Sequence, residues 1–121
     1  MTPESRKMIH DIMDSERMGY AYVYPLDGSP RQEYLISLSP ENMANFIGKQ
    51  GYDAEKIIIT DGLDRLVVNT SMVFLDTCPD QELCRKIIGY LAPIQMGEKE
   101  AGNILAVDRD IADEYFYEED Q

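Results

Sequence analysis

The chain offers few side chains that could carry out acid–base chemistry. His10, its one histidine, shares the polar side of a predicted helix with Asp11 and Asp14. Histidine titrates near neutral pH, but no nucleophile or ligand can be assigned to it. Asp61 and Asp64 are paired carboxylates of the kind that general acids and bases use, yet they flank a predicted turn, where aspartates usually bond their own backbone. These residues predict no catalytic site, and we expect a protein that is not an enzyme.

Metal and cofactor chemistry is also poorly supported. Cys78 and Cys84 do not form a Cys-x-x-Cys pair, and a single histidine does not complete a zinc set. Cys84 falls on the apolar stripe of a predicted helix, so we expect a packed, reduced thiol. The acids between Asp108 and Glu114 have no glycine at the position that a calcium loop needs. We therefore expect no metal and no cofactor.

One glycine-rich turn has the residue types of a phosphate-binding loop. Gly48, Lys49, Gln50 and Gly51 follow an apolar helical pattern and precede a buried strand at Ile57. Glycines let the backbone approach a phosphate closely, and a lysine adds positive charge. The stretch 35–68 thereby resembles a KH domain, in which a Gly-x-x-Gly loop between two helices clamps four nucleotides. The resemblance implies single-stranded RNA binding through this turn.

Two features of the same turn depart from the KH pattern. Asp53 and Glu55 put two acids where the second helix should begin beside phosphate. Few residues then remain before the strand at Ile57, so that helix is truncated. The alternative interpretation is a helix that ends at a glycine cap and is followed by a turn. The turn fits neither a P-loop nor a dinucleotide fingerprint.

The C-terminal segment 108–121 combines acids with aromatic residues. It carries seven acids and one base, Arg109, within DRDIADEYFYEEDQ. Acids and aromatics together could dock a basic, apolar groove on another protein, or mimic the charge spacing of DNA and block a DNA-binding protein. The alternative is a terminal helix packed through Ile111, Tyr115 and Phe116 with its acids in solvent. The candidate binding residues are Asp108, Asp110, Asp113, Glu114, Tyr115, Phe116 and Tyr117.

The overall charge narrows the possible partners. The chain has 121 residues and a net charge of −12 at pH 7. Such a surface repels nucleic acid and anionic membranes on average and suits a protein partner with a basic surface. No secretory signal or long apolar run is evident, so we expect a cytoplasmic protein with no membrane segment. The sequence does not specify an oligomeric state.

Three tyrosines alternate along one predicted strand. Tyr20, Tyr22 and Tyr24 would project from one face of a sheet. They could form a platform on which bases stack. They could instead be a half-buried aromatic row that pairs across a hairpin or lies under a helix. No basic residue occurs among them, so we favour the second interpretation.

The order of predicted elements indicates a single α+β domain over residues 1–121. Thr2-Pro3-Glu4, Ser39-Pro40-Glu41 and 79–82 are helix starts, Gly19 and Pro93 are helix ends, and Asp108 caps a last helix. Hairpins are predicted over 20–38 and 57–68 and an edge strand over 104–107. Residues 71–75 are predicted to form a further strand, or to continue the preceding strand after a bulge. Strands joined by tight turns pair antiparallel. We expect an antiparallel sheet of four to six strands, with three to four helices mainly on one face.

Overall fold

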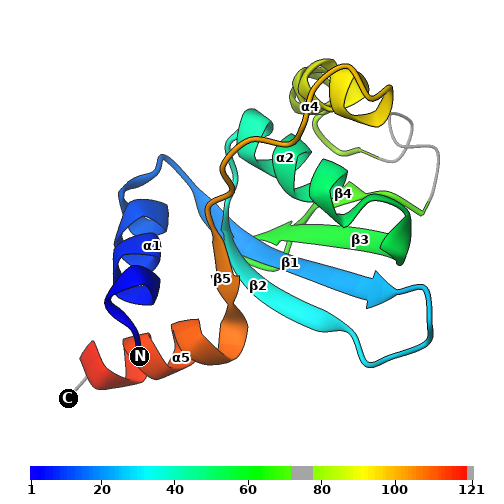
Figure 1. Cartoon of the computed structure of the whole chain (residues 1–121). Helices are drawn as coiled ribbons and strands as arrows, with labels where there is room; N and C mark the ends of the chain where they lie inside the picture. The colour runs from blue at the N-terminus through cyan, green and yellow to red at the C-terminus, as the bar shows by residue number, and fades with distance from the viewer. Residues whose placement is uncertain (72–77, 120–121) are drawn as a thin grey trace.

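The computed structural model of the protein describes residues 1–71 and 78–119. It has a five-stranded antiparallel sheet with strand order β4-β3-β1-β2-β5 (Figure 1). Most of the predicted strand over 71–75 lies outside the described residues. The elements are α1 (Pro3–Asp14), β1 (Met18–Pro25), β2 (Gln32–Ser37), α2 (Pro40–Gln50), a 3-10 turn (Gly51–Asp53), β3 (Ala54–Asp61), β4 (Leu66–Asn69), α4 (Gln81–Gln95), β5 (Ala106–Asp108) and α5 (Arg109–Glu119). The predicted α+β class is confirmed.

Local capping chemistry starts three of the helices where the sequence predicts. The Thr2 hydroxyl accepts a hydrogen bond from the Ser5 amide at 3.1 Å, and the Ser39 hydroxyl accepts one from the Asn42 amide at 3.2 Å. The Asp80 carboxylate does the same for the first turn of α4. Each cap satisfies a backbone N–H that has no partner inside the helix.

Two predicted helix ends are wrong. Helix α1 stops at Asp14, and Gly19 lies inside β1, where it pairs with Asp61 of β3. A β-carbon at Gly19 would overlap the carbonyl oxygen of Thr60, so close strand approach explains this glycine. Pro93 lies within the last turn of α4, which continues to Gln95.

The helices form two pairs on opposite faces of the sheet instead of gathering mainly on one. Strand β2 shows the division, because Ile36 packs in the cluster beneath α2 and α4 while its neighbour Leu35 packs in the cluster with α1 and α5. In Figure 1, α2 and α4 lie above the sheet, while α5 lies below it and α1 lies to its left, beside β5 and β2. The larger cluster fills the first interface with Met43, Phe46, Ile57, Ile59 and Ile87.

A buried amide holds the final segment in place. Asn42 of α2 donates hydrogen bonds to the carbonyl oxygens of Ser37 at 2.8 Å and Leu105 at 3.0 Å. Its own oxygen accepts one from the Leu105 amide at 2.7 Å. Asn45, one turn later, accepts a hydrogen bond from the Gly102 amide. These bonds guide the connector after α4 back to the sheet edge, so that β5 pairs with β2 and α5 follows.

The expectation of a free thiol at Cys84 is wrong. Cys84 and Cys78 form a disulfide with their Cα atoms 6.3 Å apart, a separation typical of disulfides. Cys78 precedes α4 and Cys84 lies in its first turn, so the six-residue spacing brings them together once the helix forms. Both residues are buried, and Cys78 Sγ lies 3.3 Å from the Val67 carbonyl oxygen of β4. The bond ties the start of α4 to the chain that enters it.

Candidate interaction surface

Helix α5 starts where the sequence predicts, at the end of the edge strand. The Asp108 carboxylate accepts a hydrogen bond from the Asp110 amide at 2.9 Å, and Asp110 lies in the first turn, where a negative charge is favoured. Strand β5 is paired with β2 up to Asp108. The sheet therefore fixes both the position and the direction of this helix.

The inner side of α5 is part of the core. Ala112 and Tyr115 are buried, and Ile111 and Phe116 pack partly against the same cluster as Ile9 of α1. The Tyr115 hydroxyl shares a hydrogen bond with His10 Nε2 at 3.0 Å. Of the aromatic candidates for docking, Tyr115 and Phe116 therefore serve intramolecular packing. Tyr117 is 68% exposed.

The outer side of α5 carries an acidic stripe, which consists of Asp110, Asp113, Glu114 and Tyr117. These residues occupy positions i, i+3, i+4 and i+7, so they share one helix face. All four are exposed. Within residues 1–71 and 78–119, no base lies within ion-pair distance of the three acids. The next acid, Glu118, is paired with Arg6 of α1 at 2.8 Å.

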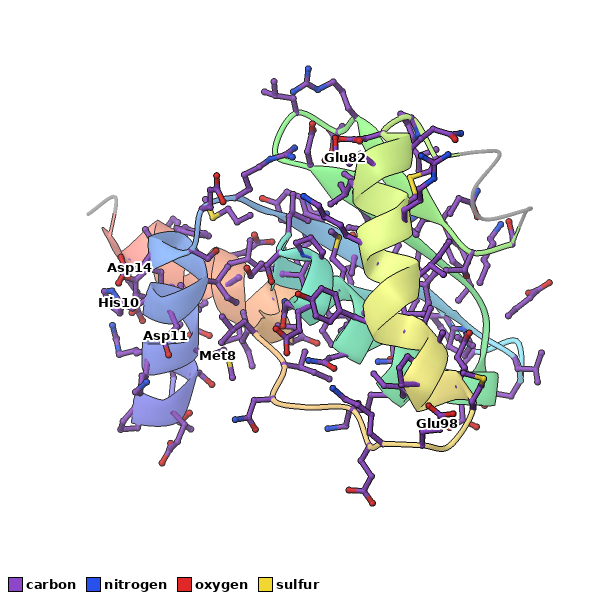
Figure 2. All side chains as sticks on the ribbon, turned by 90° about the horizontal axis from the view of Figure 1, so that it is seen from above. Met8, His10, Asp11, Asp14, Glu82 and Glu98 are labelled. Atoms are coloured by element: carbon purple, nitrogen blue, oxygen red, sulfur yellow. A yellow bond between two sulfur atoms is a disulfide. The ribbon has the colours of Figure 1, made fainter. Side chains whose placement is uncertain are left out.

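Helix α1 extends the negative surface next to α5. Figure 2 shows His10, Asp11 and Asp14 on α1, and α5 alongside that helix. Asp11 is paired with Lys7 at 2.9 Å. Asp14 is exposed, and no ion pair to it occurs among the described residues. His10 is exposed as predicted, and its contact with Tyr115 holds the two helices together.

The one base of the acidic segment points the other way. Arg109 Nη1 donates to Glu33 Oε1 at 2.9 Å and to the Tyr22 hydroxyl at 3.3 Å. Its guanidinium lies 4.3 Å from the centre of the Tyr20 ring. Burial disfavours the charge of Arg109, but the bonds and charges of Tyr22 and Glu33 outweigh that effect, so its pKa is raised. Positive charge is thereby withdrawn from the outer side of α5.

The Gly48–Gly51 turn ends a helix. The Gly51 amide donates to the Ile47 carbonyl, and Gly51 has a φ of 55°, which favours glycine. A single 3-10 turn then leads directly into β3, with no second helix between them. A β-carbon at Gly48 would lie 2.7 Å from Ile94 Cγ2, so this glycine allows α2 and α4 to approach closely.

A pocket of about 270 Å³ adjoins that turn. Its charged lining residue is Glu55, and Lys49 is not part of the lining. The other described lining residues are uncharged and include the apolar Ile47, Ile57 and Ile94 and the polar Thr70 and Gln95. Such a pocket lacks the positive charge that a phosphate backbone requires.

The tyrosine row is half-buried, as we expect from the sequence, but the expectation that it lacks basic neighbours is wrong. Arg109 covers Tyr20, Arg31 lies 5.0 Å from the centre of the Tyr22 ring, and Lys56 lies 4.6 Å from that of Tyr24. Arg109 belongs to α5, Lys56 to β3 and Arg31 to the loop that precedes β2. Lys56 is the cross-strand partner of Tyr24. Sequence analysis missed this grouping because it depends on strand register.

Asp61 is a turn residue, as predicted. Its carboxylate accepts hydrogen bonds from the amides of Arg65 and Leu63 at 3.0 and 2.8 Å and pairs with Arg65 Nε at 2.8 Å. These bonds, chiefly that of the Arg65 amide, lower the pKa of Asp61. Asp64 has a φ of 61° in the same turn. Over residues 1–71 and 78–119, no three His, Cys, Asp or Glu side chains are grouped so that they could hold a metal ion.

Comparison with protein-family models, with curated proteins and with solved structures finds no match to this chain. No helix in the described part of the chain is long and apolar enough to cross a bilayer.

Proposed function

We propose that the chain is a non-catalytic protein that binds another protein with a basic surface through the acidic stripe of α5. The observation that supports the proposal is the separation of charge on this helix. The acids of the stripe face solvent without intramolecular partners in the described residues, while Arg109 turns onto the sheet. Spacing of i, i+3, i+4 and i+7 is the pattern by which a helix presents a contact face.

Electrostatics gives the stripe a specific physical role. Unpaired acids on a chain of net charge −12 attract a basic surface over long range and speed association. Tyr117 adds an exposed aromatic ring at the end of the stripe, and tyrosine is enriched at the centres of protein interfaces. The stripe lies on a helix held by the sheet and by α1, so binding requires little ordering.

Point variants test the proposal better than truncation. Removing residues 108–121 would also remove Ala112 and Tyr115 from the core. Neutralising Asp110, Asp113 and Glu114 to their amides leaves the inner side of α5 unchanged. The variant should lose capture of the partner that the natural chain retains at moderate salt. A control that neutralises Glu55, Glu98 and Glu100 has the same net charge and should keep it; Figure 2 shows Glu98 at the far end of α4 from α5.

The same experiment separates protein docking from mimicry of DNA. If the stripe imitates DNA, the captured partner binds DNA, and duplex DNA displaces it from the chain. A partner that DNA does not displace supports docking alone.

A cytoplasmic location remains a prediction, and the Cys78–Cys84 disulfide argues against it, because such bonds persist in oxidising compartments.

A further inference from the structure

A second surface, which is positively charged, lies on the part of the sheet that α1 and α5 do not cover. These helices pack at β2 and β5, and Figure 1 shows the β1–β2 hairpin extending past them. On this face, β1 presents Tyr22 and Tyr24, and β3 presents Ile58 and Lys56 beside them. All four residues are only partly buried. The described part of the chain thus leaves this half of the sheet face uncovered.

Bases and tyrosine rings alternate along the uncovered face. Arg31 stacks on Tyr22 and donates a hydrogen bond to the Tyr24 hydroxyl at 3.2 Å, while Lys56 lies over the Tyr24 ring. Arg109 completes the row on the side of α5. Among the residues that the structure describes in the five strands, one acid lies on this face, Glu33, which pairs with Arg109 at 2.9 Å and with Arg31 at 3.8 Å. Three bases against one acid make a positive area on a strongly acidic protein.

Apolar side chains continue the same face toward the sheet edge. Leu66 of the edge strand β4 is 38% exposed. Leu66 is paired across from Thr60, which places it on the side of the tyrosines. Tyrosine and arginine beside exposed aliphatic groups are the composition of protein-binding surfaces.

We propose that this face, formed by Tyr22, Tyr24, Arg31, Lys56 and Ile58, docks an acidic segment of a partner protein. Carboxylates of the partner pair with Arg31 and Lys56, and its apolar side chains cover Ile58 and the tyrosine edges. Single-stranded nucleic acid fits less well, because Arg31 and Lys56 already cover the tyrosine ring faces on which nucleobases would stack. The local excess of charge is also small compared with the many phosphate contacts that nucleic-acid affinity requires.

Two synthetic probes test the proposal with the full chain. One is a poly-glutamate peptide of about twenty residues, and the other is the same peptide with every third residue changed to leucine. Each peptide is titrated into the protein at low salt while the backbone amide signals are recorded. The signals of Tyr22, Tyr24 and Ile58 should shift. The leucine-containing peptide should bind more tightly, because it also buries apolar surface.

Matched variants assign the binding to this face. Arg31→Glu with Lys56→Glu should weaken binding by about tenfold, the effect of losing and reversing two exposed ion pairs. The control Lys49→Glu with Lys99→Glu makes the same charge change at exposed sites elsewhere and should bind as the natural chain does. If charge reversal disturbs the amide spectrum, Arg31→Gln with Lys56→Gln gives the same comparison with less disturbance of the folded structure.

Three results would overturn the proposal. The first is the absence of shifts on this face with either peptide, and the second is equal loss of binding in both variant pairs. The third is tighter binding of an oligo-thymidine of about twenty nucleotides than of the leucine-containing peptide, which would assign the face to nucleic acid. Peptide-induced shifts that vanish only in the Arg31 and Lys56 variants would support it.

Discussion

Arg109 donates a hydrogen bond of 2.9 Å to Glu33, which ties the first residue of α5 to strand β2. The same guanidinium lies over the Tyr20 ring. Arg109 thus fixes the first turn of the helix that carries the acidic stripe. Because it is the single base of segment 108–121, its contacts with the sheet also keep positive charge away from the outer side of α5.

Arg109→Ala should lower the free energy of unfolding by about 1–2 kcal/mol, because it removes a partly exposed ion pair and a cation–π contact. A double-mutant cycle with Glu33→Gln should give a coupling free energy of about 0.5–1 kcal/mol in denaturant unfolding. A coupling of zero would mean that the pair does not anchor α5.

Asn42→Ala should destabilise the fold by about 1–3 kcal/mol, since it leaves backbone groups of Ser37 and Leu105 without their partner. Amide hydrogen exchange at Leu105 should accelerate as the connector loosens. Asn103→Ala, in the exposed part of the same connector, serves as the control. Equal unfolding midpoints for the two variants would contradict the role assigned to Asn42.

Gly19→Ala should cost about 3 kcal/mol, because the new methyl group overlaps the Thr60 carbonyl and forces β1 and β3 apart. Gly89→Ala makes the same change inside α4, where a β-carbon meets nothing within 4 Å. It should stabilise the protein by about 0.5–1 kcal/mol through helix propensity. Thermal unfolding of both variants checks the opposite signs, and a tolerated Gly19→Ala would refute the close approach.

Features that depend on neighbouring residues in the sequence could be predicted, whereas features that depend on strand pairing could not. Thr2 and Ser39 were predictable as caps because a cap bonds residues two or three positions away. The packed side of α5 was predictable from helical periodicity. The roles of Gly19 and of the bases over the tyrosines were not, because each depends on a partner from a distant strand: Thr60 lies beside Gly19 and Lys56 beside Tyr24 only once β1 and β3 pair.

The Asp61 turn predicts a pH dependence of stability. The pKa of Asp61 is lower in the folded state than its ordinary value, so the ionised carboxylate favours folding. Its contribution is complete above the unfolded pKa of about 3.9, and it is lost as the pH falls through the folded pKa. Asp61→Asn should therefore be less stable than the natural chain near neutral pH, and the gap should narrow in acid.

Urea unfolding between about pH 6 and pH 2 measures that gap across the titration range of a carboxyl group. Asp64→Asn changes the neighbouring turn aspartate without touching the bonds to Asp61, and its stability should remain parallel to that of the natural chain. A gap for Asp61→Asn that stays constant with pH would show that the charge of Asp61 does not support the turn.

The acidic stripe is tested most directly by comparing partner capture by two equally charged variants. One has Asp110→Asn, Asp113→Asn and Glu114→Gln; the other has Glu55→Gln, Glu98→Gln and Glu100→Gln. The partner retained by the natural chain should be lost from the first variant and kept by the second. Equal retention by both variants, or equal loss from both, would contradict binding through the acidic stripe of α5.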